Sequence, residues 1–160
     1  MPDHGRDPAA RMRRAWQVLH GLPGGRWLFS RFLGRMIPYT GSIRPDVLEL
    51  APGFARIRMR DRQAVRNHLR SIHAIAVTNL AEVTSGLAMT AALPATVRGI
   101  VLGITIRFDK KARGTLTAEC RCSVPAVTAR MEYPVTAMVR DGVGDTVAEA
   151  TVRWLLAPRD

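Results

Sequence analysis

One acidic residue stands alone in the most apolar stretch of the chain. Between His73 and Arg98 the only ionisable side chain is Glu82, and the segment from Ser71 to Leu93 is otherwise apolar or small. This composition predicts a helix that is buried on most sides, with Ser71 as its N-cap. A buried carboxylate is costly unless it is paired, and such groups are enriched at functional sites. Glu82 is therefore a candidate catalytic group; a buried glutamate with a purely structural role is the alternative.

Three polar residues accompany Glu82 at helical spacing. Thr78 and Asn79 lie four and three residues before it, and Ser85 lies three residues after it, so a helix places them on the same face. Polar side chains on an apolar helix need polar surroundings, either a water-filled cleft or a partner subunit. We expect Asn79 and Ser85 to contact substrate there.

The segment that leads into this helix carries further polar residues. Asn67 precedes His73 by six residues, and Glu82 follows His73 by nine, at the end of the sequence Leu80-Ala81-Glu82. This arrangement resembles the hotdog-fold thioesterase superfamily, whose phenylacetyl-CoA-type members carry Asn, His-Gly-Gly and Leu-Ala-Asp/Glu at these spacings. The resemblance covers about residues 40–157 and is strongest to a branch of uncharacterised hotdog domains.

The resemblance implies hydrolysis of an acyl-CoA or acyl-carrier thioester, with coenzyme A as part of the substrate and no separate cofactor. Glu82 would act as a general base on water or as a nucleophile on the thioester carbonyl. The amide of Ala74, at the start of the helix, would polarise the carbonyl oxygen. Asn67 would position water or the thioester, and a neutral His73 would hold the turn into the helix.

The chain departs from the family pattern directly after the histidine. Ala74 and Ile75 stand where the family has two glycines. Alanine still offers its N–H group, whereas the Ile75 side chain would narrow the path to the thioester. A hotdog protein that binds acyl-CoA or lipid without hydrolysing it is therefore the alternative function.

Basic residues in two loops are candidates to hold the phosphates of coenzyme A at the mouth of the site. They are Arg66 and Arg70 before the helix and Lys110, Lys111 and Arg113 further along the chain. The alternative for each is an ordinary solvated charge. The resemblance also implies a homodimer or a dimer of dimers, because protomers of this fold align their sheets edge to edge, with Glu82 from one chain facing the Asn67 loop of the other.

The elements that must position these residues follow from the hydrophobic pattern. Residues 9–36 predict one or two amphipathic helices, broken at 21–25 by glycine and proline. Extended segments are predicted at 42–50 and 54–59, and strands at 100–108, 115–124, 133–140 and 146–156. The predicted fold class is α+β, an antiparallel sheet wrapped around one long central helix. We assign residues 39–160 to this hotdog domain and residues 1–38 to an N-terminal helical extension.

The charge of the chain is strongly positive and unevenly distributed. Its 160 residues carry a formal net charge of +11, and residues 1–70 contain 14 arginines against five acidic residues. A basic surface attracts nucleic acid, anionic lipid or a phosphorylated ligand. Because no known nucleic-acid-binding motif accompanies it, we expect an anionic substrate and no nucleic-acid partner. Contact of the basic, amphipathic extension with a membrane surface stays open.

Two further features bear on the class of protein. The sequence shows neither a secretory signal nor an apolar run long enough to span a membrane, so we expect a cytoplasmic protein. The two cysteines, Cys120 and Cys122, form a C-x-C pair that suits small buried residues better than a disulfide. We expect no metal site, because no histidine lies near this pair.

Overall fold

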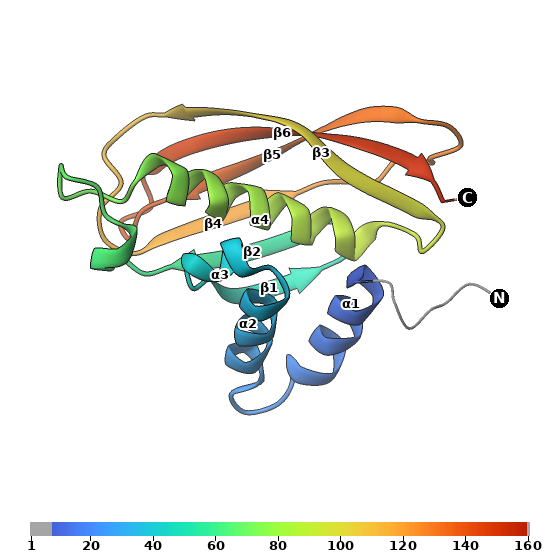
Figure 1. The fold of residues 1–160 in the computed structure, drawn as a ribbon, viewed down its shortest axis with the longest axis horizontal. Coiled ribbons are helices and arrows are strands. Elements are labelled where there is room, and N and C mark those ends of the chain that lie inside the picture. Colours follow the sequence, from blue (N-terminus) through green and yellow to red (C-terminus); the bar gives the residue numbers. More distant parts are fainter. Residues whose placement is uncertain (1–7, 160) are drawn as a thin grey trace.

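The computed structural model describes residues 8–159; residues 1–7 of the predicted extension and residue 160 lie outside the described part of the chain. Within it, six antiparallel strands form one sheet in the order β1-β2-β4-β5-β6-β3, and helix α4 (Ala74–Ala92) runs across one face (Figure 1). The strands are β1 (Asp46–Ala51), β2 (Phe54–Met59), β3 (Val97–Phe108), β4 (Leu116–Arg121), β5 (Met131–Arg140) and β6 (Thr146–Pro158). This arrangement confirms the predicted α+β hotdog fold.

Helix α4 is the centre of the core because nearly every turn of it presents an apolar residue to the sheet. Val77, Leu80, Ala81, Ala88 and Met89 are fully buried, and the helix contacts all six strands. Burial of this kind contributes roughly 1.5–3 kcal/mol for each large aliphatic side chain. The long apolar segment of the sequence therefore becomes the buried helix that was predicted.

The start of α4 differs from the prediction. The helix begins at Ala74, with His73 as its N-cap, because the backbone before it is held in a separate loop. In that loop the Ser71 amide and hydroxyl both donate to Asn67 Oδ1, and the Ile72 amide donates to the Ala112 carbonyl. Ser71 is consequently a loop residue, and its assignment as N-cap was wrong.

The strands bury one face each, as the alternation of their residues indicates. In β2 the side chains of Ala55, Ile57 and Met59 are fully buried, whereas Arg56 and Arg58 point outward. Arg56 pairs with Glu49 and Glu119, and Arg58 pairs with Asp46, so these arginines form ion pairs across the outer face of the sheet. Cys120 and Cys122 are free thiols, and Cys120 is buried.

Two helices, α1 (Pro8–Leu19) and α2 (Gly25–Met36), lie beside the β1 end of the sheet (Figure 1). The predicted break between them occurs where Gly25 meets the Leu19 carbonyl, so closely that a Cβ at this position would lie 1.7 Å from the oxygen. Phe29 and Leu33 of α2 are fully buried, and Trp16 of α1 meets the Phe29 ring edge-on, with centroids 5.0 Å apart.

The segment after α2 contains an element that was not predicted. Residues Pro38–Ser42 form a short helix, α3, so the extended segment predicted from residue 42 begins only at Asp46. Proline is well tolerated in the first turn of a helix, where its missing N–H group has no partner to lose. A three-residue 3₁₀ turn at Gln63–Val65 follows β2.

The two edge strands of the sheet differ in the hydrogen bonds made to their outer sides. At β1 the Val47 amide donates to Ser30 Oγ of α2 (2.9 Å), and Arg26 Nη1 donates to the Leu48 carbonyl (3.3 Å). At the opposite edge, no strand within residues 8–159 pairs with the outer side of β3. The large apolar side chains exposed on β3 are Ile100, Leu102, Ile104 and Phe108.

Among residues 8–159, no helix is both long enough and apolar enough to cross a membrane.

Candidate active site

Glu82 lies in the middle of α4, half-buried on the side of the helix that does not face the centre of the core. Burial raises the pKa of its carboxyl above the ordinary value. Its carboxylate oxygens accept no hydrogen bond and form no ion pair with any side chain in the described part of the chain. An unpaired, partly desolvated carboxylate of this kind is a stronger base than an ordinary one and is suited to general-base catalysis.

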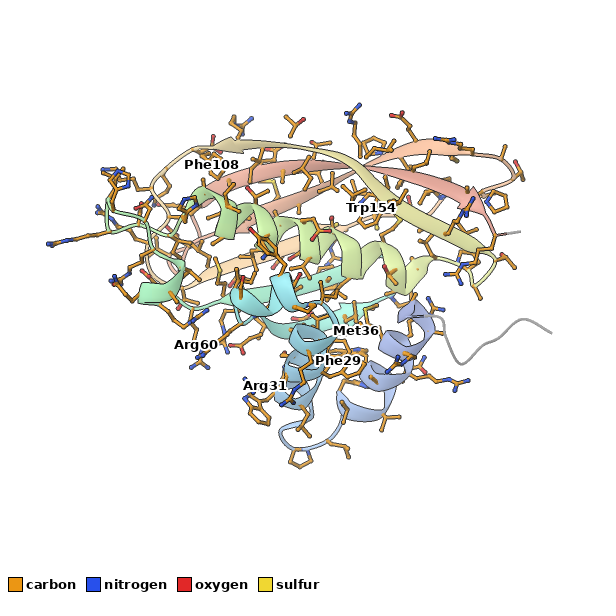
Figure 2. All side chains as sticks on the ribbon, in the orientation of Figure 1. Phe29, Arg31, Met36, Arg60, Phe108 and Trp154 are labelled. Atoms are coloured by element: carbon orange, nitrogen blue, oxygen red, sulfur yellow. The ribbon has the colours of Figure 1, made fainter. Side chains whose placement is uncertain are left out.

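An aromatic ring that the sequence analysis missed stands beside Glu82. A Cβ built on Gly86, one turn after Glu82, would lie 3.5 Å from Cη2 of Trp154 and 4.0 Å from Glu82 Oε1. Trp154 belongs to β6, on the sheet face that α4 covers (Figure 2), and its indole Nε1 is buried without an acceptor in residues 8–159. The inward alternation of Val152, Trp154 and Leu156 was the signal that would have placed it here.

The start of α4 presents a backbone donor. His73 Nδ1 accepts a hydrogen bond from the Ile75 amide at 3.1 Å, which requires Nδ1 to carry no proton. The Ala74 amide, by contrast, has no acceptor within the described residues. Because the first amides of a helix carry partial positive charge, the Ala74 N–H is suited to hold a carbonyl oxygen.

Asn67 organises its own loop. Its Oδ1 accepts from the Leu69 amide (2.9 Å), the Ser71 amide (3.2 Å) and the Ser71 hydroxyl (3.2 Å). Its Nδ2 has no hydrogen-bond partner among residues 8–159. Asn67 therefore has a fixed carbonyl oxygen and an amide group that is free to donate to a ligand.

A cavity of about 300 Å³ brings four of the predicted residues together, namely Asn67, Ala74, Lys110 and Lys111. Phe108, at the end of β3, lines the same cavity. A second cavity, of about 210 Å³, is lined by the N-cap residue His73, by Ile75 and Asn79 on α4 and by Tyr39 on α3. Ile75 is 53% exposed, so its side chain stands at the surface beside the helix start.

The five predicted phosphate-binding cations divide into two groups. Lys110 Nζ pairs with Asp141 (2.7 Å) and Asp145 (2.8 Å), and Arg66 pairs with Asp61 (2.7 Å). The remaining three have no acidic partner among the residues described, and they are Arg70, Lys111 and Arg113. Only this second group offers charge that the fold has not already neutralised.

The side chains of Asn79 and Ser85 are buried, unlike that of Glu82. Asn79 Nδ2 donates to the Tyr39 carbonyl of α3 at 3.2 Å, and Ser85 Oγ donates to the backbone carbonyl of Glu82 at 2.8 Å. Asn79 therefore joins α4 to α3, whereas Ser85 is bonded within its own helix, and the contact of both side chains with substrate stays a prediction.

Within one chain, Glu82 and the Ala74 amide are too far apart to act on one carbonyl group. Glu82 lies eight positions after Ala74 on the same helix, which corresponds to roughly 12 Å along its axis. Glu82 also lies outside the cavity that contains Asn67 and Ala74. The structure thus brings Asn67, Ala74 and the lysine loop together and leaves Glu82 apart from them.

Several solved structures are similar to the chain. A protein solved as genomics target APC5556 is 29% identical, with a TM-score of 0.81 over 93% of this chain and 99% of that chain. A Pseudomonas aeruginosa protein of unknown function, described as a probable thioesterase, is 26% identical, with a TM-score of 0.75 over 86% of this chain and 97% of that one.

A thioesterase family protein from Silicibacter pomeroyi has a TM-score of 0.68 over 81% of this chain and 96% of that one; at 15% identity, this likeness concerns the fold alone. No curated protein matches the chain. A family model described as a domain of unknown function, DUF4442, matches residues 25–156, which include the central helix, strands β1 to β5 and most of β6. The chain therefore belongs to the DUF4442 family, a hotdog thioesterase-like family.

Proposed function

We propose that the protein hydrolyses the thioester of an acyl-CoA or an acyl carrier, with Glu82 as the catalytic carboxylate. The observation that carries this proposal is the unpaired carboxylate of Glu82, whose pKa is raised by burial in a helix that holds no other charge. The probable-thioesterase description of the Pseudomonas aeruginosa protein supports the same reaction class.

In the proposed reaction Glu82 accepts a proton from water, and the resulting hydroxide attacks the thioester carbonyl carbon. The Ala74 amide donates to the oxyanion that forms, and Asn67 Nδ2 donates to the thioester or to the attacking water. The C–S bond then breaks, the acid leaves, and the proton held by Glu82 passes to the thiolate. Direct attack by Glu82, through an anhydride that water then hydrolyses, is the alternative use of the same carboxylate.

We place this site between two copies of the chain. The separation of roughly 12 Å between Glu82 and the Ala74 amide on one helix supports this arrangement, because a second copy can supply the missing group. The apolar edge of β3 is the surface on which the copies would pair, with Phe108 beside the cavity that contains Asn67 and Ala74. The acid of one protomer would then face the loop of its partner.

The test is Glu82→Gln, assayed by thiol release across acyl-CoA thioesters of different chain length and an acyl-carrier thioester. The substitution keeps the shape of the side chain but removes its basicity, so the rate should fall by about 10²- to 10⁴-fold. Glu132→Gln, an exposed glutamate on β5, is the matched control and should leave the rate near that of the wild type. An active Glu82→Gln enzyme would remove the central residue of the mechanism.

The raised pKa of Glu82 also predicts two pH dependences. The rate should rise with pH through the pKa of Glu82, because only the carboxylate can act as base. Because the pKa of Glu82 is raised in the folded state, the folded protein binds the proton more tightly than the unfolded chain does. The free energy of unfolding should therefore fall as pH rises from the pKa of Glu82 in the unfolded chain through its pKa in the folded protein. The melting temperature of Glu82→Gln relative to wild type should therefore increase with pH over that range.

A second function, binding without hydrolysis, is favoured by one observation. Ala74 and Ile75 occupy the helix start, and the exposed Ile75 side chain lies beside a cavity where the family pattern has glycine. A protein of this kind would bind an acyl-CoA measurably and release no thiol from any member of the panel.

A further inference from the structure

A third cavity lies away from the candidate active site and is strongly basic. It measures about 540 Å³ and opens between α2, α3 and the ends of β1 and β2 that lie nearest to them. Its lining includes five arginines: Arg31, Arg35, Arg44, Arg60 and Arg62. We call it the arginine cavity. It shares no lining residue with the two cavities near α4.

The positive charge of the arginine cavity is largely unneutralised. Its lining contains one acidic residue, Asp46, which already pairs with Arg58 (3.2 Å) and Arg60 (3.4 Å). Arg31, Arg35 and Arg44 form no ion pair with any residue in the described part of the chain. Uncompensated arginines in a concave site focus a positive potential that favours an anion.

Arg62 adds a buried donor without a partner. Its Nη2 donates to the Ser42 carbonyl at 3.0 Å, which fixes the guanidinium, but its Nε is buried and has no acceptor among residues 8–159. Burial lowers the pKa of Arg62, and the nearby charge of Arg44 lowers it further. A buried donor that lacks a partner costs free energy, so the Arg62 guanidinium is held at the cavity wall at a cost.

The backbone is specialised to bring these arginines together. A Cβ on Gly41 of α3 would lie 2.3 Å from the Gly34 carbonyl oxygen of α2, so the two helices approach closely only because both residues are glycine. Arg44 has a φ of 49°, in the left-handed region that side chains other than glycine rarely adopt. Its backbone is thus held in a costly conformation at the cavity wall.

We infer that the arginine cavity binds the phosphoryl group of an organic phosphate. Guanidinium groups match phosphate oxygens with paired, charge-assisted hydrogen bonds, and an anion of more than one charge balances several arginines better than a single carboxylate does. The volume exceeds what inorganic phosphate needs. Trp27, 61% exposed at the rim with the Arg31 guanidinium 5.9 Å from its ring centroid, offers an apolar surface for the rest of the ligand.

Two sources could supply such a group, a soluble phosphate compound and a phospholipid headgroup. Arg31 and Arg60 both lie on the side of the molecule away from β3 (Figure 2), so either source can reach the cavity without entering the candidate active site. The inference is independent of the proposed hydrolysis, because it involves none of the residues assigned to that reaction.

The experiment measures binding in two arms at matched ionic strength. Inorganic pyrophosphate is titrated by calorimetry, and phosphatidylcholine vesicles with and without phosphatidic acid are tested by co-sedimentation. Arg35→Gln and Arg44→Gln should each weaken binding by about tenfold or more in the arm that shows it. Arg44→Lys keeps the charge but loses the paired geometry, and should fall between wild type and Arg44→Gln.

The matched control is Arg130→Gln, which removes the same charge from an exposed arginine outside the cavity. It should bind as wild type does, and melting curves of all variants check that they are folded. If the wild type binds pyrophosphate and the cavity variants do not, the ligand is a soluble phosphate compound. If the wild type binds vesicles and the cavity variants do not, the ligand is a phospholipid headgroup. Absence of binding in both arms, or equal weakening by Arg130→Gln, would overturn the inference.

Discussion

The two edge strands of the sheet, β1 and β3, differ in whether other parts of the chain bond to their unpaired backbone groups. Every edge strand carries unpaired backbone groups that can template association. At β1, helix α2 supplies partners from Ser30 and Arg26 to the Val47 amide and the Leu48 carbonyl. At β3, twelve residues run along the edge with Ile100 63% exposed and Leu102 44% exposed, and no described strand covers them.

This difference between β1 and β3 bears on which edge could pair with a second copy of the chain. Because the chain covers part of the β1 edge itself, the proposed pairing of two copies would use the β3 edge. A pairing of β3 with β3 of a second copy would be isologous, and we expect it to close as a dimer. Helix α2 would then favour a finite assembly, because its Ser30 and Arg26 already bond to the opposite edge.

The largest effect should come from charging the open edge. Ile100→Asp combined with Leu102→Asp places like charges where two copies would meet, so we expect a monomer by analytical ultracentrifugation. If the site is shared, thiol release should fall by about 10²-fold or more, because each active site loses its oxyanion donor or its base.

The control for this double variant is Val18→Asp with Leu22→Asp, two exposed apolar residues near the turn between α1 and α2. It makes the same change in charge away from β3 and should leave both mass and rate unchanged. A monomeric β3 variant with wild-type activity would show that one chain contains a complete site.

An intermediate effect, on the free energy of unfolding, is expected at the β1 edge. Ser30→Ala removes the acceptor of the buried Val47 amide and should lower the free energy of unfolding by about 1–3 kcal/mol in denaturant titrations. Ser42→Ala, whose hydroxyl makes only an exposed bond to the Tyr39 carbonyl, should change it by less than about 0.5 kcal/mol. Equal losses in both variants would mean that α2 does not hold the β1 edge.

The smallest effect is expected on KM, when each of the two neighbouring lysines that follow β3 is replaced in turn. Lys111→Gln should raise KM for acyl-CoA substrates about two- to fivefold, as loss of an exposed charge contact does. Lys110→Gln should raise KM less, because Asp141 and Asp145 already neutralise Lys110. A larger effect for Lys110 would place the coenzyme A phosphates on a different part of this loop.

Periodicity was enough to predict the parts of the fold that are governed by burial. The apolar segment around Glu82 and the alternation of β2 and β4 determine which faces enter the core, and the structure confirms them. The start of α4 was misplaced because Ser71 is a good N-cap residue by type. Its hydroxyl instead donates to Asn67, a contact within a loop that periodicity does not describe.

The sequence predicted only those residues of the candidate site that lie close together in the chain. The spacing among Asn67, His73 and Glu82 gave the candidate residues of one segment of the chain. Trp154 comes from a strand more than seventy residues after Glu82, and both side chains border Gly86 only because the helix packs on the sheet. The arginine cavity was missed for the same reason, since α2, α3 and β2 contribute to it separately.

The pairing of β3 also has a consequence for biosynthesis. β3 joins the sheet only through β6, and β6 is synthesised after β4 and β5. Until then, the apolar residues of β3 have no sheet neighbour on either side. Pairings between segments so distant in sequence form slowly and leave apolar surface exposed. The nascent chain should therefore depend on chaperone binding at β3 during translation.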